Sequence, residues 1–97
     1  MHYRITKVSH EAGMRDKFVE ILKAKEAIIN SFEGLNYVRM IAISETATLA
    51  ISEYGSEAQL KAVEGRFKEV MIDMAPLMTA PPEVLNGDSF WEMIVKK

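Results

Sequence analysis

The sequence predicts an α+β fold whose strands and helices follow the order β-α-β-β-α-β. Residues 3–8, 36–54 and 89–95 alternate with the period of β-strands. Residues 14–32 and 56–75 instead repeat apolar side chains at i, i+3 and i+4, which is the spacing of one helical face. A chain of 97 residues has room for one small core. We therefore expect a single domain over residues 1–97.

The first strand and the first helix are predicted at the N-terminus. Tyr3 to Val8 alternates and is rich in β-branched residues, which is typical of a strand. From Met14 to Phe32 the apolar residues take helical spacing, which predicts one helix of about five turns. Gly34 stands where a helix commonly ends in the left-handed conformation.

A hairpin is predicted over residues 36–54, with its turn at residues 44–46. Both faces of this hairpin are largely apolar, whereas an antiparallel sheet with one wet side alternates between apolar and polar residues. We therefore expect each face of the hairpin to be covered.

The second helix and the last strand complete the pattern. Ser56 and Gln59 match the capping box that begins a helix, and Pro76 ends or kinks that helix. Three prolines and a turn signal between Pro76 and Asn86 predict a loop that acts as a lid or rim. The last strand is predicted over residues 89–95.

This element order is that of the ferredoxin-like, or split βαβ, arrangement: a four-stranded antiparallel sheet with two helices on one face. The opposite face then carries an apolar set larger than soluble monomers usually expose. A second copy of the same sheet is the simplest cover, so we expect a homodimer. The alternative is a monomer whose aromatic and methionine side chains lie on the surface.

Composition excludes several classes of protein. The net charge is −2 with no basic block, so nucleic acid is not an expected partner. There is no cysteine, which excludes disulfides, thiolate metal sites and cysteine nucleophiles. No apolar run approaches the roughly 18 residues of a membrane span, and no signal peptide is visible. We expect a cytoplasmic protein without a membrane partner.

Three stretches resemble the dimeric α/β-barrel superfamily, and within it the antibiotic-biosynthesis-monooxygenase-like domains. Gly13 and the following Met-Arg-Asp-Lys-Phe lead into the first helix as in that family. Residues 32–37, FEGLNY, resemble its "PGF" approach to the second strand, and residues 53–60, EYGSEAQL, resemble its "E-W-x-s-x-e-a-l" junction. The resemblance implies a dimeric α/β barrel with sheets face to face, and ligands bound between each sheet and its own helices.

The chain departs from part of the family's pattern. Family oxygenases that need no cofactor, and relatives that degrade heme, use a polar residue such as asparagine in the first strand and tryptophan and histidine near the second helix. Here the first strand offers Arg4 and Thr6, and the second helix has neither tryptophan nor histidine. The departure argues against heme degradation.

Arg39 and Glu53 are the candidate catalytic residues. Arg39 lies mid-strand between apolar residues, where a charge needs a partner. In a purely structural role Arg39 would form a salt bridge with Glu53 or Glu92. In a functional role it would anchor an acidic or carbonyl ligand. Glu53 ends a strand among apolar neighbours, where a raised pKa would suit a general base. Its alternative is a solvated or paired residue at the sheet edge.

Four aromatic residues are candidates for ligand binding, because together they suit a flat organic compound. Core or interface packing is the alternative for all of them: Tyr3, Tyr37, Tyr54 and Trp91. His2 and His10 lack ligand spacing, so we expect no metal and two solvated side chains. No glycine-rich phosphate loop is present, and no cofactor is expected.

The sequence thus favours a small dimeric monooxygenase-like protein that binds a small aromatic or polyketide-like compound. Cofactor-independent oxygenation is the reaction that the resemblance implies. The alternative is a non-catalytic ligand-binding or stress-associated protein with the same barrel. Residue patterns leave open whether the protein is an enzyme.

Overall fold

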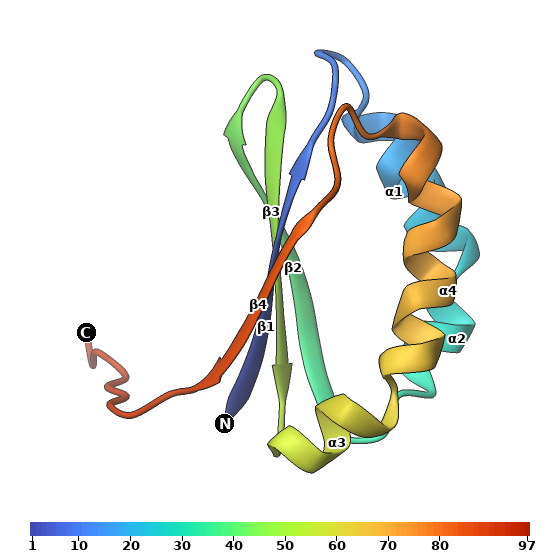
Figure 1. Cartoon of the computed structure of the whole chain (residues 1–97). Helices are drawn as coiled ribbons and strands as arrows, with labels where there is room; N and C mark the ends of the chain where they lie inside the picture. The colour runs from blue at the N-terminus through green and yellow to red at the C-terminus, as the bar shows by residue number, and fades with distance from the viewer.

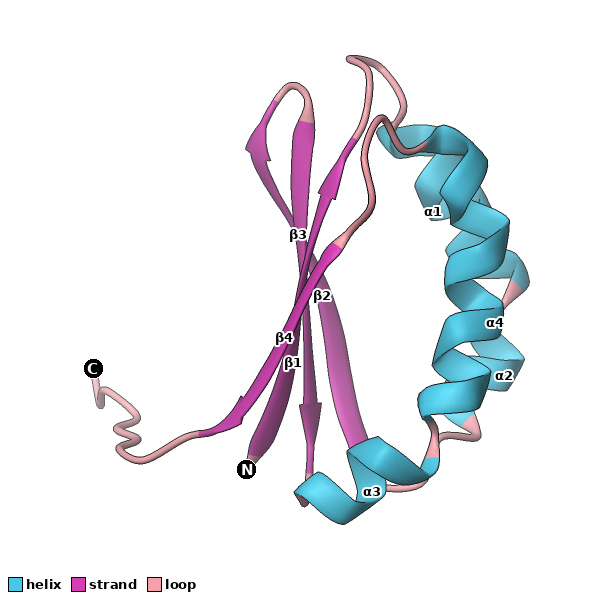
Figure 2. Cartoon of the chain, viewed as in Figure 1, coloured by secondary structure: helices cyan, strands magenta, loops and turns pink.

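A computed structural model describes all 97 residues. The helices and strands form two layers, a twisted sheet and a set of helices on one of its faces (Figure 1, Figure 2). The opposite face of the sheet carries no helix (Figure 1). The elements in chain order are β1 (His2–Ser9), α1 (Arg15–Ala24), α2 (Glu26–Asn30), β2 (Leu35–Ser44), β3 (Ala47–Tyr54), α3 (Glu57–Ala62), α4 (Glu64–Met74), the 3-10 helix η1 (Ala75–Leu77) and β4 (Glu83–Asp88).

The sheet confirms the ferredoxin-like prediction. Its strand order is β2-β3-β1-β4, and every neighbouring pair is antiparallel. β1 lies in the centre, with Tyr3 opposite Glu53 of β3 and Gly87 of β4. Because side chains alternate along each strand, we call the side toward the helices the inner face and the other side the outer face.

Each of the two long predicted helices is broken once. Lys25 separates α1 from α2, and Val63 separates α3 from α4; both residues leave the helical region, with φ near −101° and −108°. The first break lets each half pack on a different part of the core, since Phe18 joins one buried cluster and Ile29 packs on another. At the second break the chain changes direction, and α3 lies across the end of the sheet (Figure 2).

The last strand is residues 83–88, so the prediction of residues 89–95 was wrong. Asn86-Gly87 suggested a turn, but these residues lie in the edge strand β4, where a glycine is tolerated because one side of the strand needs no partner. The predicted loop from Pro76 to Asn86 is accordingly wrong for residues 83–86. Residues 89–97 form neither helix nor strand and extend away from the sheet (Figure 1).

Ser56 begins α3 as predicted, because its Oγ accepts a hydrogen bond from the Gln59 amide at 3.2 Å. Gly34 has the left-handed φ of +84°, but α2 already ends at Asn30 with Ser31 as its cap, so Gly34 lies in the turn before β2 rather than at the end of the helix. The core has two clusters between the layers, one around Tyr54 and Leu60 and one around Phe18. No helix combines the length and the apolar character that crossing a bilayer requires.

Candidate ligand-binding cleft

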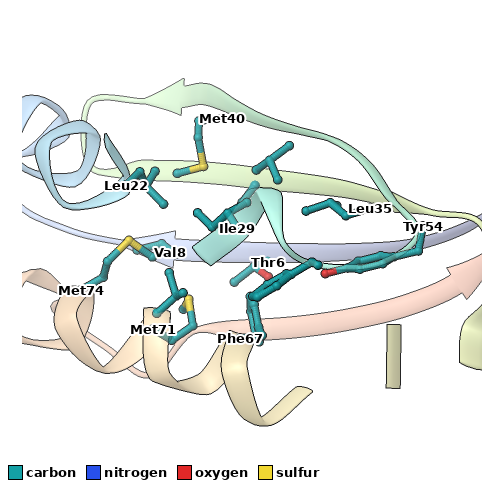
Figure 3. Close-up of a pocket in the computed structure, with 14 residues that line it drawn as sticks. Thr6, Val8, Leu22, Ile29, Leu35, Met40, Tyr54, Phe67, Met71 and Met74 are labelled. Carbon is teal, nitrogen blue, oxygen red and sulfur yellow. The ribbon is translucent and has the colours of Figure 1, made fainter. Parts of the chain in front are cut away.

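The space between the sheet and the helices contains an apolar cavity of about 60 Å³, which we call the inner cavity. Even-numbered residues of β1 and β3 lie on the inner face, because the buried positions in both strands alternate in that register. Four of them line the cavity: Thr6, Val8, Ala50 and Tyr54. Figure 3 shows methionine and aromatic side chains from α4 opposite the sheet. Thr6 supplies one of the few polar groups of a lining that includes Val8, Met40, Tyr54, Phe67, Met71 and Met74.

A wider groove lies beside the inner cavity, between β2 and the helices α1 and α2. Its volume is about 450 Å³. It shares with the inner cavity the residues Leu22, Ile29, Leu35, Val38 and Met40. Because β2 is an edge strand, this lateral groove is an approach from solvent to the inner cavity.

A third pocket lies at the other edge of the sheet from the lateral groove, between β1, β4 and α4, and we call it the Arg4 bay. Its volume is about 260 Å³, and it shares Phe67 and Met71 with the inner cavity. The other residues that line it are mostly polar: Arg4, Glu64, Lys68, Pro82, Val84 and Asn86. The cleft therefore has an apolar middle and a polar end.

Arg4 is a buried cation, only 3% exposed. Its Nη1 donates a hydrogen bond to the Tyr54 hydroxyl at 2.9 Å, and its guanidinium carbon lies 3.7 Å from the centroid of the Phe67 ring. Its Nη2 is buried and has no hydrogen-bond partner. Burial raises the pKa of Tyr54, with the Arg4 charge opposing, so this phenol is neutral at physiological pH. Sequence reasoning missed Arg4 as a site residue, although its alternation with Thr6 and Val8 was visible.

Glu53 lies on the outer face in a hydrogen-bonded network. It accepts bonds from the Tyr3 hydroxyl at 2.6 Å and from the Asn36 amide at 2.9 Å. The bond from Tyr3 and, to a smaller extent, the bond from Asn36 lower the pKa of Glu53. The bond between Tyr3 and Glu53 also raises the pKa of Tyr3. The expected raised pKa of Glu53 is therefore wrong, because donors stabilise its charged form.

Arg39 also lies on the outer face, opposite Ile51 of β3. Its guanidinium carbon is 4.2 Å from the centroid of the Tyr37 ring. It forms none of the salt bridges of the chain, so the structural interpretation of a bridge to Glu53 or Glu92 was wrong. Stacking on an aromatic ring is the contact that it makes instead.

The predicted site residues fall into three groups. Tyr54 lies in the cleft (Figure 3). Trp91 lies in the C-terminal segment, is 73% exposed and does not line the cleft. The structure brings together on the outer face Tyr3, Tyr37, Arg39 and Glu53.

Both histidines are buried, against the expectation that they are solvated. His10 bonds Thr48 Oγ1 at 2.9 Å and the carbonyl of Glu11 at 2.8 Å. His2 bonds Asp88 Oδ1 at 2.7 Å through Nδ1 and Asn86 Oδ1 at 3.0 Å through Nε2. The bond to Asp88 raises the pKa of His2, with burial opposing.

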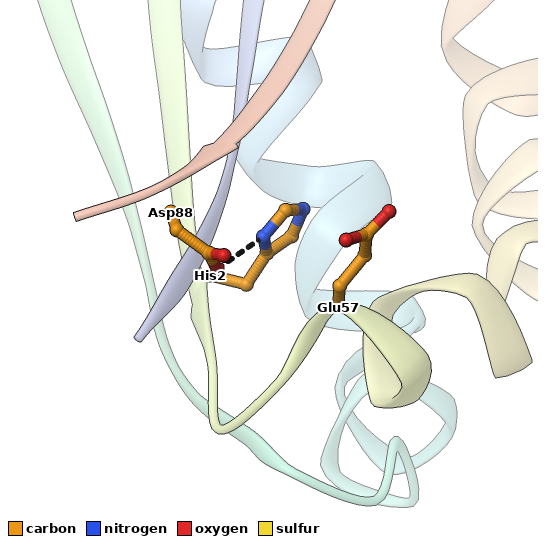
Figure 4. A group of neighbouring side chains, drawn as sticks. All are labelled: His2, Glu57 and Asp88. Atoms are coloured by element: carbon orange, nitrogen blue, oxygen red, sulfur yellow. Dashed lines mark hydrogen bonds and ion pairs between the residues drawn. The ribbon is translucent and has the colours of Figure 1, made fainter. Parts of the chain in front are cut away.

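His2 is also the centre of the one group of side chains with metal-ligand chemistry. The Glu57 carboxylate joins His2 and Asp88, and one ligand atom from each lies within 4.8 Å of the others (Figure 4). Each ring nitrogen of His2 already faces an acceptor, Asp88 or Asn86. This arrangement suits a doubly protonated ring better than a metal ligand, which must present a bare nitrogen.

Solved structures share this architecture. The Streptomyces coelicolor monooxygenase from the gene ActVA-Orf6, solved with the ligand nanaomycin D, superposes with a TM-score of 0.83 at 14% identity over 98% of this chain and 92% of its own. A Caulobacter crescentus CB15 protein, provisionally described as an antibiotic biosynthesis monooxygenase, gives 0.76 at 17% identity over 93% and 90%. NE2512 from Nitrosomonas europaea, of unknown function, gives 0.75 at 12% identity over 99% and 95%.

No protein-family model matches the chain, and no curated protein matches it either. Identities between 12% and 17% support likeness of fold. The neighbours agree with the residue-level resemblance, since two of the three carry a monooxygenase description. The chain has the ferredoxin-like fold of these proteins.

Proposed function

We propose that this protein binds a small aromatic or polyketide-like compound in the cleft between its sheet and its helices and oxygenates it without a cofactor. The observation that carries the proposal is the inner cavity, whose apolar lining includes the neutral Tyr54 phenol, to which the buried Arg4 donates a hydrogen bond from the adjoining bay. An apolar cleft with a few convergent polar groups is the usual form of a small-molecule site. The S. coelicolor neighbour, which was solved with an organic ligand, agrees with this use of the fold.

Cofactor-free oxygenation places the electron source in the substrate. An electron-rich ring system that loses a proton gives an anion, and this anion reduces O₂. For an anthrone-like methylene the balanced change is loss of both C–H hydrogens, transfer of one oxygen atom to form the carbonyl, and release of the other as water. The protein's part is to hold the ring, exclude water and stabilise the anion.

Oxygen consumption with a panel of dihydroxyaromatic and anthrone-like compounds tests this function. Ala50 lines the inner cavity, whereas Ala47 of the same strand is on the outer face. We expect Ala50→Leu to fill the cavity and abolish turnover, and Ala47→Leu to keep it, with melting temperatures showing that both variants fold. Turnover that survives Ala50→Leu would argue against the cleft, and turnover lost in Arg39→Met would favour chemistry on the outer face.

Binding without turnover is the second candidate function. It is favoured by the position of Arg39 and Glu53, the two expected catalytic residues, on the face away from the cleft. Tight binding of panel compounds with no oxygen consumption would support it. In that case the protein is a small-molecule carrier or sensor rather than an enzyme.

We also propose that the protein is a homodimer through its outer face. Apolar side chains project there from all four strands, and Leu85 of β4 is 67% exposed. The other main members of this apolar set are Ile5, Ile41, Ile43, Leu49 and Ile51. A two-fold partner would present the same patch to itself and bury on the order of 1,200–2,000 Å².

Sedimentation equilibrium tests the dimer. We expect a mass of twice the 11.0 kDa of the chain at micromolar concentration. Ile51→Lys should both dissociate and destabilise the protein, whereas Ile72→Lys on the exposed side of α4 should do neither. A monomeric native protein would overturn this part of the proposal.

A further inference from the structure

We propose that the Arg4 bay is an anion-binding site that receives the carboxylate or phenolate of an amphipathic organic acid. This inference rests on the proposed ligand cleft and narrows its ligand class from flat apolar compounds to those that carry an acidic group. The acidic group pairs with Arg4, and the apolar part of the ligand lies against Phe67 and Met71.

The first argument is the unpaired charge of Arg4. The side chain is 3% exposed, and no carboxylate forms a salt bridge with it. Removing a cation from water without an anionic partner is costly, and so is a buried donor without an acceptor. Nη2 is such a donor, while Nη1 is used by Tyr54. An anion in the bay satisfies both the charge and the donor.

The second argument is that Arg4 is held in place before any ligand arrives. Phe67 packs on the guanidinium plane, and the Tyr54 hydroxyl accepts from Nη1. A guanidinium with a fixed plane presents the N–H groups of Nη2 in a defined direction, which suits the planar geometry of a carboxylate. The fold therefore fixes the orientation of Arg4 in advance, and ligand binding does not have to order this side chain.

The rest of the lining agrees with an anionic guest. Lys68 adds a second cation at the rim, and Asn86 uses its Oδ1 for His2, which leaves its Nδ2 group as a further donor. Glu64 also lines the bay and is the one opposing charge. Two cations and an amide against one exposed carboxylate leave a net preference for an anion.

The bay joins the apolar cavity rather than standing apart from it. Phe67 and Met71 line both, so a ligand bound to Arg4 has apolar surface directly beside its acidic group. The volume of about 260 Å³ accepts an acidic group together with an aromatic ring. A neutral amide of the same shape fills the same space but leaves the charge of Arg4 without a counterion.

A matched pair of probes tests the inference. Isothermal titration calorimetry in low-salt buffer near neutral pH compares the dissociation constants of 2-naphthoate, an anion, and 2-naphthamide, its neutral analogue. We expect the native protein to bind the anion about tenfold or more tightly than the amide, which is the worth of one buried charge-assisted hydrogen bond. Arg4→Met should remove this preference, and Arg66→Met, at an exposed position of α4, should preserve it.

The variants and the outcomes separate this inference from the proposed function. Equal binding of both probes to the native protein would overturn the anion site and leave the cleft intact, whereas binding of neither would overturn both. Should Arg4→Met fail to fold, the Nε–Hε signals of the native arginines decide the matter. A shift of the Arg4 signal on addition of 2-naphthoate supports the inference, and a shift confined to Arg15, Arg39 or Arg66 contradicts it.

Discussion

The guanidinium carbon of Arg4 lies 3.7 Å from the centroid of the Phe67 ring, so a charged residue of β1 and an aromatic residue of α4 join the two layers of the fold. The second ring near this cation is that of Tyr54, at 5.3 Å. Cation–π attraction strengthens when the cation is desolvated, as Arg4 is. The contact therefore holds the helices on the sheet and orients the cation of the cleft.

A double-mutant cycle measures this contact. Arg4→Met and Phe67→Leu should be energetically coupled, with a coupling free energy of about 0.5–2 kcal/mol between them. Urea unfolding of the native protein, both single variants and the double variant supplies the four free energies. Arg39→Met with Phe67→Leu is the control pair and should show additive effects, because Arg39 lies on the outer face whereas Phe67 lies in α4, which covers the inner face. Additivity of the Arg4 pair would mean that stacking contributes nothing.

Glycine substitutions should have opposite signs at two positions. Gly34 has φ +84°, a conformation that costs an L-residue about 1–2 kcal/mol, so Gly34→Ala should destabilise the protein. Gly65 lies inside α4, and a Cβ added there would meet no packing neighbour within 4 Å. Gly65→Ala should therefore stabilise the protein by about 0.4–1 kcal/mol. A higher melting temperature for Gly34→Ala would contradict the account of Gly34, and a lower one for Gly65→Ala would contradict the account of Gly65.

The His2–Asp88 pair should make stability depend on pH. The pKa of His2 is raised in the folded protein, so its contribution is fully present below the unfolded value of about 6.5, while Asp88 remains ionised, and is lost as the pH rises through the folded pKa. Asp88→Asn should cost more stability near pH 6 than near pH 9 in urea unfolding. Asp16→Asn, in the first turn of α1, is the control and should show a loss that does not vary over this range. An equal loss from Asp88→Asn at both values would contradict the raised pKa.

The periodicity of apolar residues was enough to predict the fold. It failed where one sequence pattern is compatible with two different local structures. β1 and β3 were predicted from alternation alone. Asn86-Gly87 suits a turn as well as an edge strand, and only pairing with β1 decides between them. The helix breaks at Lys25 and Val63 carry neither proline nor glycine, so local sequence held no signal for them.

The candidate site was harder to predict because alternation separates two faces without saying which one meets the helices. Arg39 interrupts a strand that is apolar on both sides, whereas Arg4 shares its side of β1 with Thr6 and Val8. The alternation was equally compatible with either arginine on the inner face. Packing assigns Arg4 to the inner face, beneath Phe67, and Arg39 to the outer face, on Tyr37.

Methionine methyl signals test the central claim, which is that a small organic compound binds between the sheet and the helices. Met40, Met71 and Met74 line the inner cavity, whereas Met93 lies in the exposed C-terminal segment. Spectra of protein labelled at the methionine methyl groups, recorded with and without 1,8-dihydroxyanthrone, should show shifts for the three cavity methionines and none for Met93. Cavity methyl signals that stay unchanged at saturating compound would contradict binding in the cleft.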